Sequence, residues 1–141
     1  MPPKGTLVHN IPDKMQTTWL NDSKAILDTW ITYDVDLASF RCAVLDSAVP
    51  HLRQQHGVAY IVDSSEASGG FSDEIQTFIG AEVFRAFSAA GIKYFITVTS
   101  KVSILAKITV AEYSAKAGPW GLTLVEVNSV EDAEAWLKQH A

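Results

Sequence analysis

The side chains best suited by type and position to bind a ligand follow two apolar stretches, and they are Asp63, Ser64, Ser65, Thr99, Ser100 and Lys101. Carboxylate, hydroxyl and ammonium groups can together hold an anion or the polar end of a small molecule. If both apolar stretches are parallel strands, their carboxyl ends share the edge of the sheet at which open α/β folds bind ligands. We therefore predict a ligand-binding site formed by these six residues.

Each of these residues also has a purely structural interpretation. Asp63 can accept a phosphoryl group, or it can brace the following loop through hydrogen bonds from the backbone to its side chain. Ser64 and Ser65 are either phosphorylation sites or ordinary turn serines. The segment 99–101 can bind an anion at the start of a helix, or Ser100 can simply cap that helix. Both interpretations stay open at this point.

No recognisable catalytic or metal-binding set accompanies these residues in the sequence. The four histidines share no metal-ligand spacing, and they are His9, His51, His56 and His140. Gly69-Gly70 lacks the spacing and the Lys-Ser/Thr of a P-loop, and nothing resembles the strained elbow around a nucleophilic serine. We therefore expect a protein that is not an enzyme and that holds no metal or cofactor. A small enzyme using Asp63, Ser100 and Lys101 is the alternative.

Length and composition favour one intracellular globular domain. The 141 residues are 48% hydrophobic and 19% charged, which suits a single domain over 1–141 with a flexible lead at 1–4. The net charge is −5 and the cations are scattered, so we expect no nucleic-acid partner. No apolar run reaches the roughly 20 residues of a membrane span, and the first residues lack a secretory layout. We expect a cytoplasmic protein with a buried, reduced thiol at Cys42.

The hydrophobic periodicity switches repeatedly between that of strands and that of helices. Strands are predicted at 15–20, 25–32, 58–63, 94–99 and 122–127, with a further edge strand at 6–11. Helices are predicted at 36–56, 72–90, 102–117 and 129–140, with Asp36 and Ser72 as N-caps and Gly57 as the glycine that ends the first helix. Turn residues make the first two strands a hairpin, and helical crossovers require the later strands to be parallel. The fold class is therefore α/β, with one mixed, mostly parallel sheet in the order β-β-α-β-α-β-α-β-α.

Two apolar features bear on binding. The residues of helix 102–117 that are predicted to face the core are Ile104, Leu105, Ile108, Ala111 and Ala115. Large rings are numerous for so small a domain, and they include Phe71, Phe78, Phe84, Phe87, Trp19, Trp30, Trp120 and Trp136. Because Val83 and Phe84 are adjacent, one of them should point away from the inward stripe. That residue either lines a pocket or subunit contact, or is covered by a second layer.

Two local stretches and the element order resemble a known family. The strand exit Ile61-Val62-Asp63-Ser64-Ser65 looks like the Asp-Ser-Ser stretch at which anti-sigma-factor antagonists are phosphorylated, and the ending over 122–137 is similar to that of small bacterial SpoIIAA-like proteins. Residues 14–140 thus resemble a STAS/SpoIIAA-like domain. The resemblance implies a non-enzymatic binding or regulatory module, whose partner is another protein, a second copy in a homodimer, or a small apolar or anionic ligand at the strand ends. The alternative is a switch phosphorylated at Ser64 or Ser65.

Overall fold

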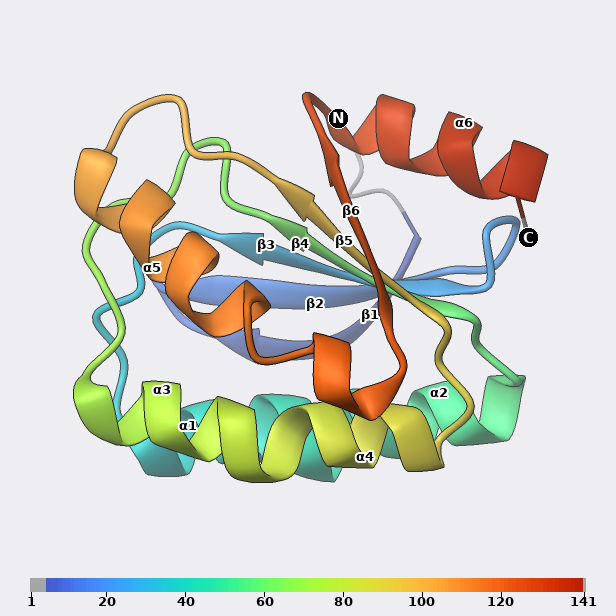
Figure 1. The fold of residues 1–141 in the computed structure, drawn as a ribbon, viewed down its shortest axis with the longest axis horizontal. Helices are drawn as coiled ribbons and strands as arrows, with labels where there is room; N and C mark the ends of the chain where they lie inside the picture. The colour runs from blue at the N-terminus through green and yellow to red at the C-terminus, as the bar shows by residue number, and fades with distance from the viewer. Residues whose placement is uncertain (1–4, 141) are drawn as a thin grey trace.

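One six-stranded sheet organises the protein in the computed structural model, which describes residues 5–140 (Figure 1). Its strands lie in sequence order: β1 (Thr6–Ile11), β2 (Met15–Leu20), β3 (Ala25–Trp30), β4 (Ala59–Asp63), β5 (Tyr94–Val98) and β6 (Thr123–Val127). β2 runs antiparallel to both of its neighbours, β1 and β3, and β3 to β6 are parallel. The predicted fold class is confirmed, and the hairpin gains β1 as an edge strand. The predicted lead at 1–4 lies outside the described residues.

Four helical regions connect and close the sheet. The first runs through α1 (Leu37–Arg41), the π-helical segment η1 (Cys42–Ala48) and α2 (Val49–Gln55), and the second through α3 (Asp73–Phe78), the π-helical segment η2 (Ile79–Val83) and α4 (Phe84–Ala89). The other two are α5 (Ile104–Ser114), followed by the short 3-10 turn η3 (Gly118–Trp120), and α6 (Val130–His140). Asp36 and Ser72 cap the first two regions, as predicted.

The helices divide unequally between the two faces of the sheet. Because β3, β4, β5 and β6 follow one another in the same direction, right-handed crossovers place α1 to α5 on one face. Tyr60 and Phe95 point into the large core on that face, whereas Ile61 and Ile96 point into a smaller core beneath α6. Figure 1 shows α1 to α4 along one side of the sheet and α6 on the opposite side.

The orientation of α5 contradicts the prediction. Ile104, Leu105 and Ile108 are 79%, 56% and 49% exposed, and Ala111 and Ala115 are also exposed. The buried residues of α5 are Ala106, Thr109, Val110 and Tyr113. Because α5 carries apolar side chains all around its circumference, periodicity alone does not define its inward face. Packing selects the face with Ala106 and Thr109, which allow another segment to approach closely.

Three smaller predictions are also wrong. Cys42 is exposed rather than buried, because it lies two residues from both Phe40 and Val44 and so points away from their inward stripe. The first helical region ends with His56, not Gly57, in the left-handed conformation, at φ 57°. The residue that caps α5 is Ser103, whose hydroxyl accepts the Ala106 N–H, so this helix begins later than 102.

Candidate functional site

The structure brings the two predicted strand-end segments side by side. The Ser64 N–H donates to the Val98 carbonyl at 3.0 Å, and the Lys101 N–H donates to the Ser65 carbonyl at 3.1 Å. These bonds extend the β4–β5 pairing beyond the strands themselves. The predicted neighbourhood of the six residues therefore exists at the carboxyl edge of the sheet.

Most polar atoms at this edge are already bonded within the protein. Asp63 Oδ1 accepts the Ser65 N–H at 3.0 Å, which is the bracing role predicted as the alternative to phosphoryl transfer. The Ser64 hydroxyl is completely buried and shares a short hydrogen bond with the Tyr33 hydroxyl. Hydrogen bonds of this kind hold the loop that follows β4 in place.

The segment after β5 is held in a similar way. Ser100 Oγ donates to the Ala67 carbonyl at 3.1 Å and accepts the Ser103 N–H at 3.2 Å, and Lys101 Nζ donates to the Asn128 carbonyl at 2.8 Å. Thr99 differs from its neighbours, because it lines an open cleft of about 270 Å³ between α5 and β6. The strand ends thus form a bonded framework more than an open anion site.

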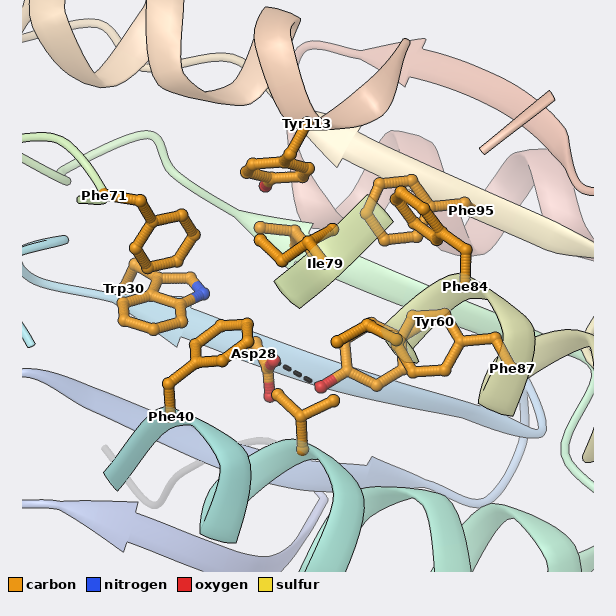
Figure 2. A pocket seen from close by; sticks show the side chains of 13 residues that line it. Asp28, Trp30, Phe40, Tyr60, Phe71, Ile79, Phe84, Phe87, Phe95 and Tyr113 are labelled. Carbon is orange, nitrogen blue, oxygen red and sulfur yellow. Dashed lines mark hydrogen bonds between the residues drawn. The ribbon is translucent and has the colours of Figure 1, made fainter. Parts of the chain in front are cut away.

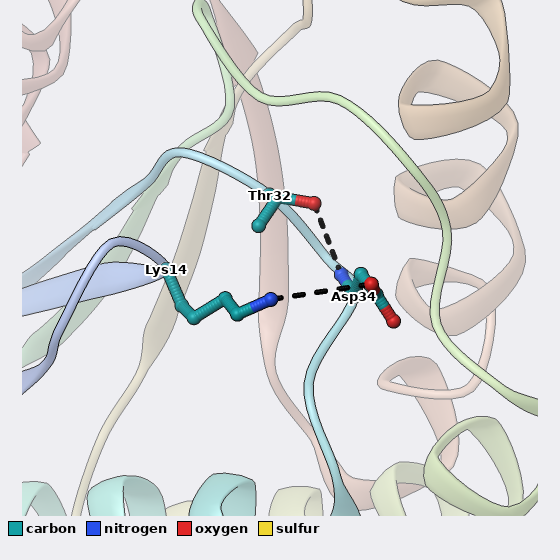
Figure 3. A network of polar contacts seen from close by, with 3 residues as sticks. All are labelled: Lys14, Thr32 and Asp34. Atoms are coloured by element: carbon teal, nitrogen blue, oxygen red, sulfur yellow. Dashed lines mark hydrogen bonds and ion pairs between the residues drawn. The ribbon is translucent and has the colours of Figure 1, made fainter.

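Residues 31–34, between β3 and α1, form a polar strap that fixes the other side of the loop after β4 (Figure 3). The Lys14 carbonyl accepts the Ile31 N–H at 2.7 Å, and the Asp34 N–H donates to Thr32 Oγ1 at 3.2 Å. The Lys14–Asp34 ion pair is 3.9 Å long and exposed, so it adds little stability. The strap also binds the loop directly, since the Tyr33 N–H donates to the Ser68 carbonyl at 2.8 Å.

Two glycines let the loop from 64 to 71 fit between this strap and α5. Gly69 has a φ of +74°, a conformation that side chains rarely adopt. A Cβ atom on Gly70 would lie 2.7 Å from Thr109 Oγ1 and 3.1 Å from Leu105 Cγ. This close approach delivers the next residue, Phe71, to the edge of the large core.

The most unusual polar group of the chain is Asp28, which was not among the predicted site residues. It lies in the middle of β3 with its carboxyl in the large core, where it is only 2% exposed. Thr17 Oγ1 on β2 donates to its Oδ1 at 2.7 Å, and the Tyr60 hydroxyl on β4 donates to its Oδ2. The available sequence signal was a lone acid at an inward position of an otherwise apolar strand.

Burial makes Asp28 a weak acid. Removal from water raises its pKa from 3.8 to about 7, although the hydrogen bonds from Tyr60 and Thr17 oppose this shift. Burial also raises the pKa values of Tyr33, Tyr60 and Tyr113. Near neutral pH, Asp28 is therefore the group in this cluster that changes its charge.

Asp28 lines an internal cavity of about 30 Å³ (Figure 2). The other lining residues are mostly aromatic: Trp30, Phe40, Val44, Tyr60, Val62, Phe71, Ile79, Val83, Phe84, Phe87, Phe95 and Tyr113. All except Phe71 are buried, and Phe71 is half-buried. Its ring lies 4.5 Å from Tyr33, 5.1 Å from Phe40 and 5.3 Å from Trp30 between centroids. The cavity has room for one or two water molecules, and Phe71 is its most exposed lining residue.

Both π-helical segments supply lining residues. Val44 comes from η1, and Ile79 and Val83 come from η2. A π-turn carries one extra residue and so changes the phase of the side chains that follow it. As a result Val83 and Phe84 are both buried and both line the cavity, whereas regular α-helical spacing predicted that one would point away. Such π-turns are frequent at functional sites.

Comparisons with models of protein families, with curated proteins and with solved structures found no match to this chain. The STAS/SpoIIAA-like resemblance therefore remains a hypothesis. No helix within residues 5–140 is long and apolar enough to cross a membrane. Within the same range, no three His, Cys, Asp or Glu side chains lie close enough together to hold a metal ion.

Proposed function

We propose that the chain is a non-enzymatic binding module that takes a small, largely apolar molecule into the cavity behind Phe71. The observation that carries this proposal is the cavity itself, which has aromatic walls, one buried carboxyl group and a single half-buried residue at its border. Ligand sites are mostly apolar with a few placed polar groups. The binding position thus moves from the strand ends, where the sequence suggested it, to the core behind them.

The last part of the loop after β4, residues 69–71, acts as the lid of this site. A ring-sized ligand does not fit the closed cavity of about 30 Å³, so it must displace Phe71 and occupy the volume that the phenyl ring leaves. Phe71 follows directly on Gly69 and Gly70, which adjust their backbone most readily. The predicted residues Ser64 and Ser100 keep the rest of the loop fixed through their hydrogen bonds to Tyr33 and Ala67 while residues 69–71 move.

Toluene is the probe that tests this proposal, because it matches the side chain that it should replace. In an NMR titration of the wild-type protein we expect shifts at Trp30, Tyr60 and Tyr113. Phe71→Ala should bind toluene about tenfold more tightly, because no ring has to be displaced. The variant itself should lose about 2 kcal/mol of stability, less than a fully buried Phe→Ala change.

Phe78→Ala provides the matched control, because Phe78 is also half-buried but does not line the cavity. It should bind toluene as the wild type does. The proposal is wrong if toluene at its aqueous solubility limit shifts no lining residue in either the wild type or Phe71→Ala.

A second candidate function is self-association through α5, favoured by its exposed apolar side chains. Ile104 and Ile108 form a stripe along the outer face of the helix, and Lys107 and Glu112 lie on opposite flanks of it. When two such helices align in parallel, a lysine and a glutamate spaced by five residues face each other across the seam. The partner that this charge arrangement fits is a second copy of the chain.

Replacing both Ile104 and Ile108 by lysine should abolish this self-association and change stability by less than about 1 kcal/mol, because both residues are exposed. Sedimentation velocity over a range of concentrations measures the association. Leu7→Lys serves as the control, because Leu7 is 55% exposed but lies on β1, and it should leave the association intact. A wild-type protein that stays monomeric at millimolar concentration contradicts this candidate function.

A further inference from the structure

The chemical class of the ligand follows from the charge balance around the cavity. Asp28 carries the one carboxyl group among the described residues that line the cavity, and none of these residues is a lysine, arginine or histidine. An ionised Asp28 is therefore surrounded by apolar groups and neutral hydroxyls. A buried charge without an opposite charge costs free energy. A cation bound beside Asp28 would offset that cost.

The carboxyl group also retains hydrogen-bonding capacity. A carboxylate offers about four lone-pair positions on its two oxygens. Thr17 occupies one position on Oδ1 and Tyr60 occupies one on Oδ2. The two remaining positions can accept N–H groups, which makes the carboxylate a suitable partner for a donor with more than one proton.

The walls of the cavity favour the same kind of ligand. The face of an aromatic ring carries negative electrostatic potential and attracts ammonium groups, most strongly when they are removed from water. Rings surround Asp28 on two sides in Figure 2, with Trp30, Phe40 and Phe71 on one side. On the other side Tyr60 and Phe87 stack at 4.4 Å.

We propose that the ligand is an organic ammonium ion with an aromatic or similarly compact apolar part. Its ammonium group pairs with the Asp28 carboxylate, and its apolar part takes the volume vacated by the Phe71 ring. This inference rests on the proposed function, and it specifies the ligand class for the same site. No bond is made or broken, and the ligand enters and leaves unchanged.

Protons compete with such a ligand for Asp28. The titratable side chains that act electrostatically with Asp28 are Tyr33, Tyr60 and Tyr113, and burial keeps all three neutral at ordinary pH. Thr17 donates a hydrogen bond to the carboxyl, and every other residue that lines the cavity with Asp28 carries no charged group at ordinary pH. Affinity for an ammonium ligand should therefore fall as Asp28 becomes protonated, by up to tenfold for each pH unit below the pKa of about 7.

Three probes of similar size test whether the site prefers an ammonium group, separately from whether it binds an aromatic ring. Benzylamine, benzyl alcohol and toluene are each titrated into the wild-type protein at pH 8 and pH 5.5, with affinity read from NMR shifts of Trp30 and Tyr60. At pH 8 we expect benzylamine to bind at least tenfold more tightly than benzyl alcohol. At pH 5.5 most of this preference should be lost, while toluene binding changes little.

Asp28→Asn keeps the shape of the side chain and removes its charge, so it should lower the affinity for benzylamine to that for benzyl alcohol and abolish the preference. If wild-type protein binds the two neutral probes as tightly as benzylamine, the ammonium inference is wrong and the proposed function stands. The inference is equally wrong if Asp28→Asn keeps the preference. If none of the three probes shifts a lining residue, in the wild type or in Phe71→Ala, the proposed function fails as well.

Discussion

Replacing Asp28 by asparagine is expected to raise the free energy of unfolding by about 4 kcal/mol at pH 8.5 and by less than about 1 kcal/mol at pH 4. The pKa of Asp28 is about 7 in the folded protein and 3.8 in its ordinary environment. A raised carboxyl pKa means that the folded state holds its proton more tightly than the unfolded state. Its contribution to stability is therefore complete below pH 3.8 and is lost as the pH rises through about 7. Asparagine stays neutral and avoids that loss.

Urea denaturation of both proteins across this pH range measures the effect. Asp46→Asn provides the control, because Asp46 is exposed on η1 and its replacement changes the net charge by the same amount. The control should alter stability by less than about 0.5 kcal/mol at either pH. A loss of stability in Asp28→Asn at pH 8.5 would show that the hydrogen bonds from Thr17 and Tyr60 outweigh the cost of burying the charge.

Ser64→Asp is expected to destabilise the fold by about 4 kcal/mol at pH 7, whereas Ser65→Asp should cost less than about 1 kcal/mol. Ser64 is 0% exposed, and a carboxylate there would lose the neutral contact with the Tyr33 hydroxyl and enter the core without a cation. Ser65 is partly exposed at the surface of the loop. The two adjacent serines therefore form a matched pair that differs mainly in burial.

This pair bears on the phosphorylation hypothesis. A phosphate group is larger and more highly charged than a carboxylate, so burial opposes its addition at Ser64 more strongly still. If the chain is a phosphorylation-switched antagonist, mass spectrometry of kinase-treated folded protein should place phosphate on Ser65 and leave Ser64 unmodified. If the two aspartate variants were equally stable, burial would not oppose a negative charge at position 64.

The fold was largely predictable because the spacing of apolar residues differs clearly between its strands and its helices. The β4 and β5 segments are short apolar runs between helices, and Asp36 and Ser72 are N-caps in the structure as in the sequence. The inward face of α5 was not predictable, because Ile104 and Val110 offer equally apolar faces and only tertiary contacts distinguish them.

The candidate site was predictable only at its rim. Because parallel strands end at the same edge of the sheet, the segments at 63–65 and 99–101 were correctly predicted to lie side by side. The cavity in the core next to these segments was not predictable. It depends on two π-turns, and the spacing of apolar residues in the sequence does not indicate a π-turn. Asp28 was missed for a related reason. Its charge suggested an outward position, although strand alternation places it on the same side of β3 as Ile26 and Trp30, which lie in the large core.

The two π-turns also give the helices beside the cavity a discrete alternative geometry. Each π-turn stores one surplus residue, so a return to regular α-helix would pass that residue along the helix and rotate the following side chains by about 100°. In η2 this rotation would move Val83 relative to Ile79. If the helix exchanges between these two registers, the wall of the cavity changes its outline. The proposed site would then fit ligands of different outline without local unfolding.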